Sequence, residues 1–276
     1  MKRDRLFWRV LTYIALAIML IISLFPVYWI IITSFKANSE IFSLVPSMFP
    51  QQPTLDGYNE LLNNSDFLYW LEHSAVISLV VASVSVAFSA VAAYGLARFR
   101  FRVRGAIGVL ILIAYLMPPT LLFIPLYSMV TSLGLSGSLL SLMLIYPTLT
   151  VPYATWVLTT YFRGLSPEFE EAAIVDGCSR LQSFWRITVP LASPGIVSTF
   201  IFSFTLCWSE YLYALVIADR STLTVPVGLS SFIVADVFRW NVIMAGAVIT
   251  SIPIIVLYTL ASKYIVSGLT LGGLKG

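Results

Sequence analysis

Long stretches of uncharged, mostly apolar residues alternate along this chain with short polar segments. The three longest are Leu11–Phe35, Ser74–Ala97 and Gly105–Phe162, which hold 25, 24 and 58 residues without a charge. A helix that crosses a bilayer needs about 20 apolar residues. The third stretch is too long for one helix, and the Gly- and Ser-rich residues 131–138 in its middle predict a turn that divides it into two.

The whole pattern predicts six spanning helices, because two further apolar segments, Ile187–Ser209 and Asn241–Ser262, follow the first three. We therefore expect an all-α membrane protein. The predicted spans cover residues 10–34, 74–97, 107–130, 138–161, 191–215 and 242–264. Pro118, Pro119 and Pro125 predict a kink in the third span, because proline removes a backbone donor and clashes with the preceding turn.

Composition agrees with this pattern. Of the 276 residues, 59% are hydrophobic and 11% are charged, whereas a soluble domain is about half apolar and about a quarter charged. The net charge of +3 is dispersed, and no basic run interleaved with aromatic residues predicts nucleic-acid binding. The two cysteines, Cys178 and Cys207, do not have the spacing of a metal site, so no metal is expected.

Basic residues predict the orientation of the chain. Thirteen of the sixteen lie in the N-terminal segment, in the second-to-third and fourth-to-fifth connections, or after the sixth span, and the others are Lys36, Arg220 and Arg239. Because basic residues near span ends are retained in the cytoplasm, we expect both termini to be cytoplasmic. Residues 36–73 are then an outer loop, with a short helix expected near Tyr58–Leu62.

Small residues recur every four positions in the second span, at Ser85, Ser89, Ala93 and Ala97. Such a stripe lets another helix approach closely. The sequence leaves two interpretations open, packing inside the bundle and contact with another subunit.

The connection from Arg163 to Pro190 has the pattern of a helix, a turn and a second helix. Ser166 can cap a first helix that begins with Pro167, and acidic residues follow where the helix dipole favours negative charge. Gly177 suits the left-handed turn that ends a helix. Ser179 can begin a second helix, which Pro190 is expected to end. From these residues alone, the segment is either a well-capped surface hairpin or a docking element.

The same segment carries a motif. Glu171, Ala172 and Ala173, followed by Gly177, Ile187 and Pro190, resemble the EAA motif of the permease subunits of ABC-type importers. In that family the motif forms a coupling helix that sits in a groove of the cytoplasmic ATPase. The resemblance therefore implies that Glu171, Ala172, Ala173, Asp176 and Gly177 couple this chain to an ATPase.

The resemblance extends along nearly the whole chain and narrows to the carbohydrate-importer permeases of the maltose-system type. The segments that carry it are Phe35-Lys36, Thr54–Tyr58, Ala92–Arg98, Met117–Pro119 and Gly268–Gly276. The chain departs from the family pattern at Val189, where leucine is usual, and at Trp208-Ser209-Glu210, where Trp-Asn-Glu is more typical. The second departure affects the exit half of the fifth span.

The family implies a type I importer permease fold and a set of partners. The chain would divide into a first helix with its outer loop (residues 1–73), a five-helix core with the coupling loop (74–265, loop 163–190) and a C-terminal tail (266–276). The implied partners are a second homologous permease, two ATPase subunits and an extracytoplasmic solute-binding protein, in a bacterial or archaeal cytoplasmic membrane.

No catalytic residue or cofactor is expected in this chain itself. The sequence has no Gly-x-x-x-x-Gly-Lys-Ser/Thr loop to bind phosphate, so ATP and Mg²⁺ are assigned to the partner subunits. Two other functions remain open. One is the same kind of importer for a non-sugar solute such as glycerol phosphate. The other is an ion-coupled secondary transporter, although the spans at 107–161 lack the intramembrane ionisable groups that such carriers use.

Candidates for the substrate path come from the fourth and fifth spans. The aromatic candidates are Tyr146, Tyr153, Trp156, Trp208 and Tyr211. Each can stack on a sugar ring or serve only in packing. Glu210 is expected near the outer interface, either paired with a loop residue such as Arg220 or Arg239, or lining the path.

Overall fold

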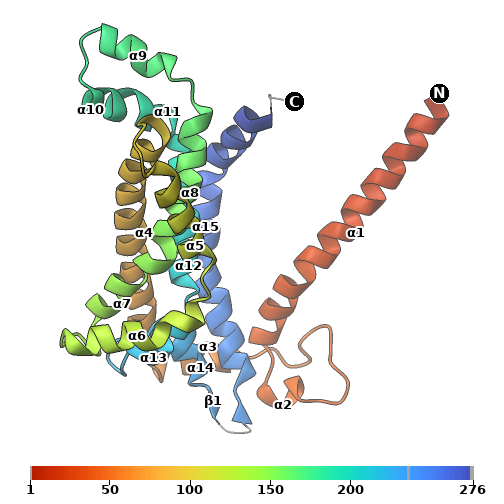
Figure 1. Ribbon diagram of the computed structural model, residues 1–276. Coiled ribbons are helices and arrows are strands. Elements are labelled where there is room, and N and C mark those ends of the chain that lie inside the picture. The colour runs from red at the N-terminus through yellow and green to blue at the C-terminus, as the bar shows by residue number, and fades with distance from the viewer. Residues whose placement is uncertain (1, 235–236, 274–276) are drawn as a thin grey trace. The chain divides into compact units, whose positions relative to one another are not determined.

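The computed structural model describes residues 2–234 and 237–273 (Figure 1). These residues divide into two compact units. One unit contains the residues up to Phe67 together with Gly228–Ile252, and the other contains Leu68–Val227 together with the residues from Pro253 onward. Nothing in this division tests the predicted boundaries at residues 73 and 265, which stay predictions.

Several helices among the described residues have the length and apolar composition of membrane spans. Four helical segments there are long and apolar enough to cross a bilayer, namely Trp8–Ser34, Phe67–Arg98, Leu139–Gly164 and Trp240–Ser262. Two bent helix pairs, Arg104–Leu116 with Pro119–Ser132 and Arg180–Leu191 with Ser193–Trp208, raise the number to six if each pair is one span. The all-α, multi-spanning fold is thus confirmed, and the described residues add one short antiparallel pair, β1 (Ile233–Val234) with β2 (Val237–Phe238).

The smaller unit holds α1 (Lys2–Ser34), α2 (Asn38–Ile41), α3 (Asp56–Asn63), α14 in part (Val225–Ser230) and the start of α15 (Trp240–Gly273). The short helix expected near Tyr58 is α3. Its Gly57 lies against the start of α15, where an added Cβ would stand 2.7 Å from the Asn241 carbonyl oxygen. An ion pair between Arg239 Nη1 and Glu60 Oε1, 2.9 Å apart, joins α3 to the residue directly before α15.

The larger unit is built around α4 (Phe67–Arg98), α8 (Pro147–Gly164) and α12 (Ser193–Trp208). The small residues of α4 face inward, since Ser85 Oγ and Thr150 Oγ1 of α8 are 2.7 Å apart and Ser89 Oγ donates to the Val151 carbonyl. An added Cβ at Gly195 would lie 2.6 Å from the Tyr161 ring, so α12 also approaches α8 closely. The small-residue stripe therefore packs inside the bundle.

The third predicted span, residues 107–130, is a broken helix and not a kinked one. It consists of α5 (Arg104–Leu116) and α6 (Pro119–Ser132), which meet at 95°. Met117 and Pro118 both have extended backbone, the conformation that a following proline imposes on its predecessor. Two consecutive prolines thus end α5 where sequence reasoning expects only a bend.

The fifth predicted span, residues 191–215, is also interrupted. Its helix α12 ends at Trp208, and α13 (Leu212–Ile217) begins after a break. In a continuous helix the amides of Tyr213 and Ala214 would bond to carbonyls four residues earlier. Here they donate to the Glu210 carboxylate instead, at 2.8 and 3.1 Å. The side chain of Glu210 therefore replaces the backbone acceptors and starts a new helix.

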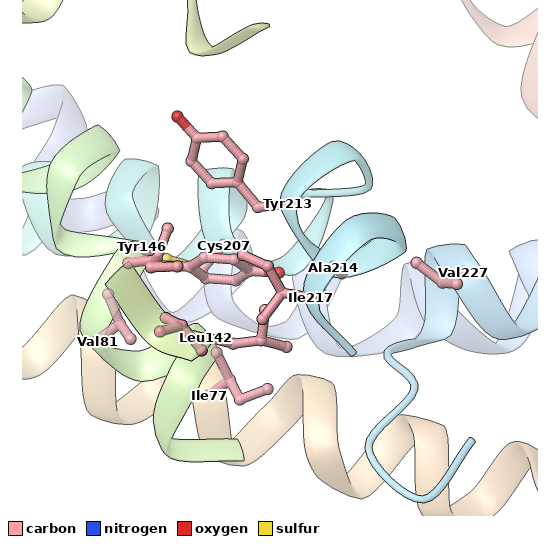
Figure 2. Packing of buried hydrophobic residues seen from close by; sticks show 11 residues of the cluster. Ile77, Val81, Leu142, Tyr146, Cys207, Tyr213, Ala214, Ile217 and Val227 are labelled. Atoms are coloured by element: carbon pink, nitrogen blue, oxygen red, sulfur yellow. The ribbon is translucent and has the colours of Figure 1, made fainter. Parts of the chain in front are cut away.

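The fourth span agrees with prediction as α7 (Leu139–Ile145) followed by α8, and Gly134 and Gly137 in the preceding turn both have positive φ. Figure 1 shows α9 and α10 at one end of α4 and α8, and α6, α7 and α13 at the other end. A buried cluster at this second end includes Ile77, Leu142, Tyr146, Cys207 and Tyr213 (Figure 2). It holds the helices that follow the two breaks onto α4 and α7.

Candidate functional site

The connection between α8 and α12 folds as the predicted hairpin. It contains α9 (Glu168–Val175), α10 (Arg180–Ser183), a π-helical turn η1 (Phe184–Thr188) and α11 (Val189–Leu191). We call residues 168–183 the α9–α10 hairpin. The prediction that Pro190 ends the second helix is wrong, because Pro190 lies at the start of α11. Its ring is tolerated there because the first turn of a helix needs no donor at that position.

Both ends of the turn between α9 and α10 are capped. Gly177 has a φ of +91°, a conformation that costs a residue with a Cβ free energy. Its N–H donates to the Ile174 carbonyl, and the Cys178 N–H donates to that of Ala173, which is the Schellman arrangement. Ser179 and Gln182 then form a capping box at the start of α10. The hairpin has a defined shape at its tip.

The start of α9 differs slightly from the prediction. The helix begins at Glu168, one residue later than expected, and Pro167 is its N-cap residue. The Ser166 hydroxyl still accepts a long hydrogen bond, 3.4 Å, from the Glu168 N–H.

The predicted coupling residues divide between two faces of α9. Glu171, Ala172, Asp176 and Gly177 are exposed, whereas Ala173 is buried. Large apolar side chains are exposed beside the first group, with Val175 at 86% and Leu181 at 68% of full exposure. An apolar surface of this kind on a projecting element is typical of a docking site.

Sequence reasoning overlooked Glu170, which the structure places among the residues that hold this hairpin. Glu170 is 8% exposed, and its Oε1 lies 2.7 Å from Arg98 Nε at the end of α4. Tyr94 donates its hydroxyl to Oε2 of the same carboxylate at 2.9 Å. The sequence offered one signal, an arginine at the end of the second predicted span that needs an acidic partner. It could not show which of the three glutamates of α9 is that partner.

At the other end of the larger unit, a cavity of about 500 Å³ lies where the two broken spans meet. Polar side chains in its lining are Tyr115, Thr120, Thr148, Ser209, Glu210 and Tyr211. The Tyr213 hydroxyl donates to the Pro119 carbonyl at 3.2 Å, so the residues after each break are tied together. The cavity has the size and mixed lining of a small-molecule site.

The predicted path residues separate into those at this cavity and those in the core. Glu210 and Tyr211 line it. Tyr146 is fully buried in the cluster of Figure 2, and Trp208 is 5% exposed and stacks on Phe204. Tyr153 packs between Tyr115 and Phe202, with ring centroids 5.9 and 4.3 Å away.

Trp156 is 42% exposed and lines a separate, smaller pocket with Arg163 and Thr160. Sequence reasoning also missed Tyr115 as a cavity residue. The available signal was the proline pair Pro118-Pro119, which begins three residues later and marks the break next to the cavity.

Of the two arrangements left open for Glu210, the described residues show no ion pair with Arg220. The Glu210 carboxylate accepts the two α13 amides described above, and Arg239 is paired with Glu60. The carboxylate is thus a helix cap that also faces the cavity. Among the described residues, no group of three or more His, Cys, Asp or Glu side chains could hold a metal ion.

The larger unit is thus a bundle of apolar helices, some of them broken, with a capped, apolar-tipped hairpin at one end, and comparison with known families gives the class of this multi-spanning membrane protein. Residues 85–270 match the model of the binding-protein-dependent transport system inner membrane component family. This range holds the hairpin and both broken spans. The chain belongs to this family of ABC importer permeases, in which the EAA motif and its coupling helix are typical.

Individual proteins are similar over nearly the full length. The chain is 38% identical to the inner membrane ABC transporter permease protein YcjP of Escherichia coli, covering 96% of this chain and 95% of that one. It is 34% identical to the trehalose/maltose transport system permease protein MalG of Thermococcus litoralis, covering 99% of each. A crystal structure of a bacterial ABC transporter that imports the polysaccharide alginate has the same fold, with a TM-score of 0.79, 22% identity and coverage of 96% and 98%.

Proposed function

We propose that this chain is a permease subunit that imports a carbohydrate by alternating access, driven by ATP that partner subunits hydrolyse. The relative from Thermococcus litoralis is named for trehalose and maltose, and the transporter with the matching fold imports alginate. Trehalose, maltose and the acidic polysaccharide alginate are all carbohydrates, although they differ in size and charge. Such names support the class of solute and leave the particular sugar open.

The α9–α10 hairpin is the element through which ATPase movement reaches this chain. The observation that carries this proposal is the exposed side of α9, where Glu171, Ala172 and Asp176 stand beside Val175 and the fixed Gly177 turn. Small side chains permit a close fit in a cleft, and burial of the exposed apolar side chains would stabilise the contact. The predominance of basic residues on the same side of the predicted membrane supports a cytoplasmic hairpin and cytoplasmic termini.

The remaining components of the importer are a second homologous permease, two ATP-binding subunits and an extracytoplasmic solute-binding protein. The description of the family as binding-protein-dependent supports the last of these. ATP and Mg²⁺ belong to the ATP-binding subunits, since the sequence of this chain has no phosphate-binding loop of the Gly-x-x-x-x-Gly-Lys-Ser/Thr type.

The cavity between the broken spans is the proposed part of the substrate path in this chain. It combines aromatic surface from Tyr115 and Tyr211 with hydroxyl groups and the Glu210 carboxylate. A carboxylate accepts hydrogen bonds from sugar hydroxyls and repels anions. The lining therefore favours a neutral sugar or polyol over the glycerol phosphate alternative.

The test is Gly177→Trp in the complete complex, purified from its native host through a tag on this chain. A tryptophan at this position would both strain the turn and fill the contact with the ATPase. We expect sugar uptake in vesicles to fall by about tenfold or more, the range of a lost coupling between sites, while membrane insertion is unchanged.

Two matched variants isolate the cause. Gly177→Asn tolerates positive φ and adds little bulk, so it should keep most of the uptake. Gly105→Trp adds the same bulk at a glycine with open space around it, on the same predicted side of the membrane, and should transport normally. Wild-type uptake by Gly177→Trp would refute the coupling role.

The solute class is tested by ATP hydrolysis of the same complex in lipid, with its binding protein, over disaccharides, trisaccharides, polyols and glycerol phosphate. Stimulation by neutral sugars or polyols is expected. Stimulation by glycerol phosphate alone would remove the carbohydrate assignment and leave the importer class intact.

A further inference from the structure

Glu170 is oriented unlike its acidic neighbours on α9. Glu168 and Glu171 are exposed, while Glu170 is 8% exposed and points at the end of α4. A carboxylate with so little access to water loses hydration, and it needs charged or hydrogen-bonding partners to compensate. The identity of those partners shows what the residue can do.

Glu170 has partners on α4 for both of its oxygen atoms. Arg98 Nε is 2.7 Å from Oε1, and the Tyr94 hydroxyl is 2.9 Å from Oε2. Arg98 also donates through Nη2 to the Leu165 carbonyl at 3.1 Å. Leu165 lies in the short connection between α8 and α9, so one guanidinium holds both the helix and the segment that leads into it.

Aromatic and cation–π contacts hold α10 and η1 against the same end of α4. The Tyr94 and Phe184 ring centroids are 4.7 Å apart, and Phe184 is 2% exposed. The Arg180 guanidinium of α10 lies 5.6 Å from the centroid of the Phe99 ring, just after α4. The last turn of α4 and the residue directly after it therefore contact α9, α10 and η1.

The chain runs from α8 to α9 through residues 165–167, which are outside any helix, and α9 also packs on η1. Such a connection lets a helix pivot. A charged, doubly bridged contact permits few alternative geometries, because any other arrangement leaves a buried charge unpaired. The contact thus determines the direction in which α9 points more than it adds to overall stability.

We propose that Arg98, Glu170 and Tyr94 are positioning residues that join α9 rigidly to α4, so that a displacement of the hairpin moves the membrane helix instead of pivoting at residues 165–167. This inference rests on the proposed coupling role of the hairpin. Packed elements that move as one body transmit a displacement, whereas a flexible joint absorbs it. Loss of the link would leave ATP hydrolysis intact and reduce the sugar moved per ATP.

The experiment is a charge exchange in the complete complex, with Arg98→Glu, Glu170→Arg and the double variant. Each is purified from membranes through a tag on this chain, and the co-purified ATPase subunits report assembly. Sugar uptake and ATP hydrolysis are then measured in the same proteoliposomes. We expect each single variant to lower uptake per ATP by about tenfold, within the usual range of coupling energies, and the double variant to recover at least half of the loss.

Matched controls reverse charge nearby without touching the link. Arg100→Glu alters an exposed arginine two residues beyond Arg98, and Glu168→Arg alters an exposed glutamate on the same helix. Both should keep the wild-type ratio of uptake to hydrolysis. A general effect of charge on the hairpin would lower the ratio in the controls as well, and would overturn the proposal.

Tyr94→Phe provides a variant that keeps the charges and the ring packing but removes one hydrogen bond. We expect it to assemble normally and to lower uptake per ATP by about threefold, the equivalent of one modest hydrogen bond. If the charge variants fail to insert, this variant decides. A wild-type ratio for Tyr94→Phe, or a double exchange that assembles but recovers nothing, would overturn the link.

Failure of this proposal is distinguishable from failure of the coupling role. If Gly177→Trp abolishes uptake while Arg98→Glu and Glu170→Arg transport normally, the hairpin couples without the link. If Gly177→Trp itself transports normally, the coupling role is lost, and any defect in the link variants is a folding effect.

Discussion

Two glutamates at opposite ends of the larger unit have different kinds of hydrogen-bond partners. Glu170 and Glu210 both place a carboxylate where helices meet. Glu170 binds side chains more than seventy positions earlier in the chain, on α4, whereas Glu210 binds backbone amides three and four positions later. The Glu170 contacts join α9 to α4, whereas the Glu210 contacts cap the start of α13, directly after the break in its own span. Connection between helices agrees with the proposed coupling role of the hairpin, and local capping leaves the proposed substrate path independent of the other helices.

The largest effect is expected for Glu170→Ala, which should lower the free energy of unfolding and so tests the contrast between the two glutamates. Removing one partner of a buried ion pair leaves Arg98 with an unpaired charge, and we expect the free energy of unfolding to fall by about 3 kcal/mol. The measurement is SDS-titrated unfolding of the purified chain, followed by helical circular dichroism. Arg100→Ala, at an exposed position, is the control and should change the value little. A loss under about 1 kcal/mol would show that the pair is solvated and that the contrast with Glu210 is overstated.

A smaller effect is expected for Glu210→Ala. The two amides at the start of α13 would lose their acceptor, which costs about 1 kcal/mol for a helix N-terminus. The same SDS titration gives this value. Because the carboxylate also faces the cavity, stimulation of ATP hydrolysis by neutral sugars should fall while basal hydrolysis stays unchanged.

Glu210→Gln is the companion variant, because it keeps one acceptor oxygen and removes the charge. It should retain most of the stability, and it should weaken discrimination against glycerol phosphate. Unchanged discrimination would mean that the carboxylate serves only as a cap.

The smallest effect is expected for the acidic groups of the polar loops. The side-chain hydrogen bond from Asn64, assisted by Arg239, holds the pKa of Glu60 below its usual range, and the Ser221 hydroxyl does the same for the pKa of Asp219. A lowered pKa in the folded chain contributes stability above the unfolded pKa of about 4.3 for Glu or 3.9 for Asp. That contribution is lost as pH falls through the folded pKa.

The check is the unfolding midpoint of the wild type and of Glu60→Gln between pH 7 and pH 3. The variant should be less stable by about 0.5 kcal/mol at pH 7, as for other exposed ion pairs, and the two curves should converge at the acidic end. Parallel curves over the whole range would show that Glu60 does not contribute to the acid sensitivity.

The comparison also shows which features a sequence can reveal. Long apolar runs, the basic-residue pattern and the Gly177 turn all act locally, so the spanning helices and the hairpin were predictable from neighbouring residues. The two breaks were only partly visible. Pro118 and Pro119 predicted a bend, but the break at Ser209 depends on a side chain that replaces backbone acceptors, which no apolar pattern records.

Pairings between distant residues were not predictable for the same reason. The glutamates of α9 are equivalent in propensity and charge, and only the packing of α4 against α8 selects Glu170 as the buried one. The small residues Ser85 and Ser89 that allow this packing were recognisable as a stripe, yet two interpretations fitted them. The cavity likewise requires Tyr115 and Tyr211, from separate spans, to meet at two interruptions.

The length of α4 has one more consequence. Its 32 residues make a rod of about 48 Å at 1.5 Å per residue, while the hydrocarbon layer is about 30 Å thick. The excess must stand in the headgroup layer or in water. Arg98 is the last residue of this helix. The same uninterrupted helix α4 therefore packs in the bundle and also extends past the hydrocarbon layer, where it contacts the α9–α10 hairpin through Arg98.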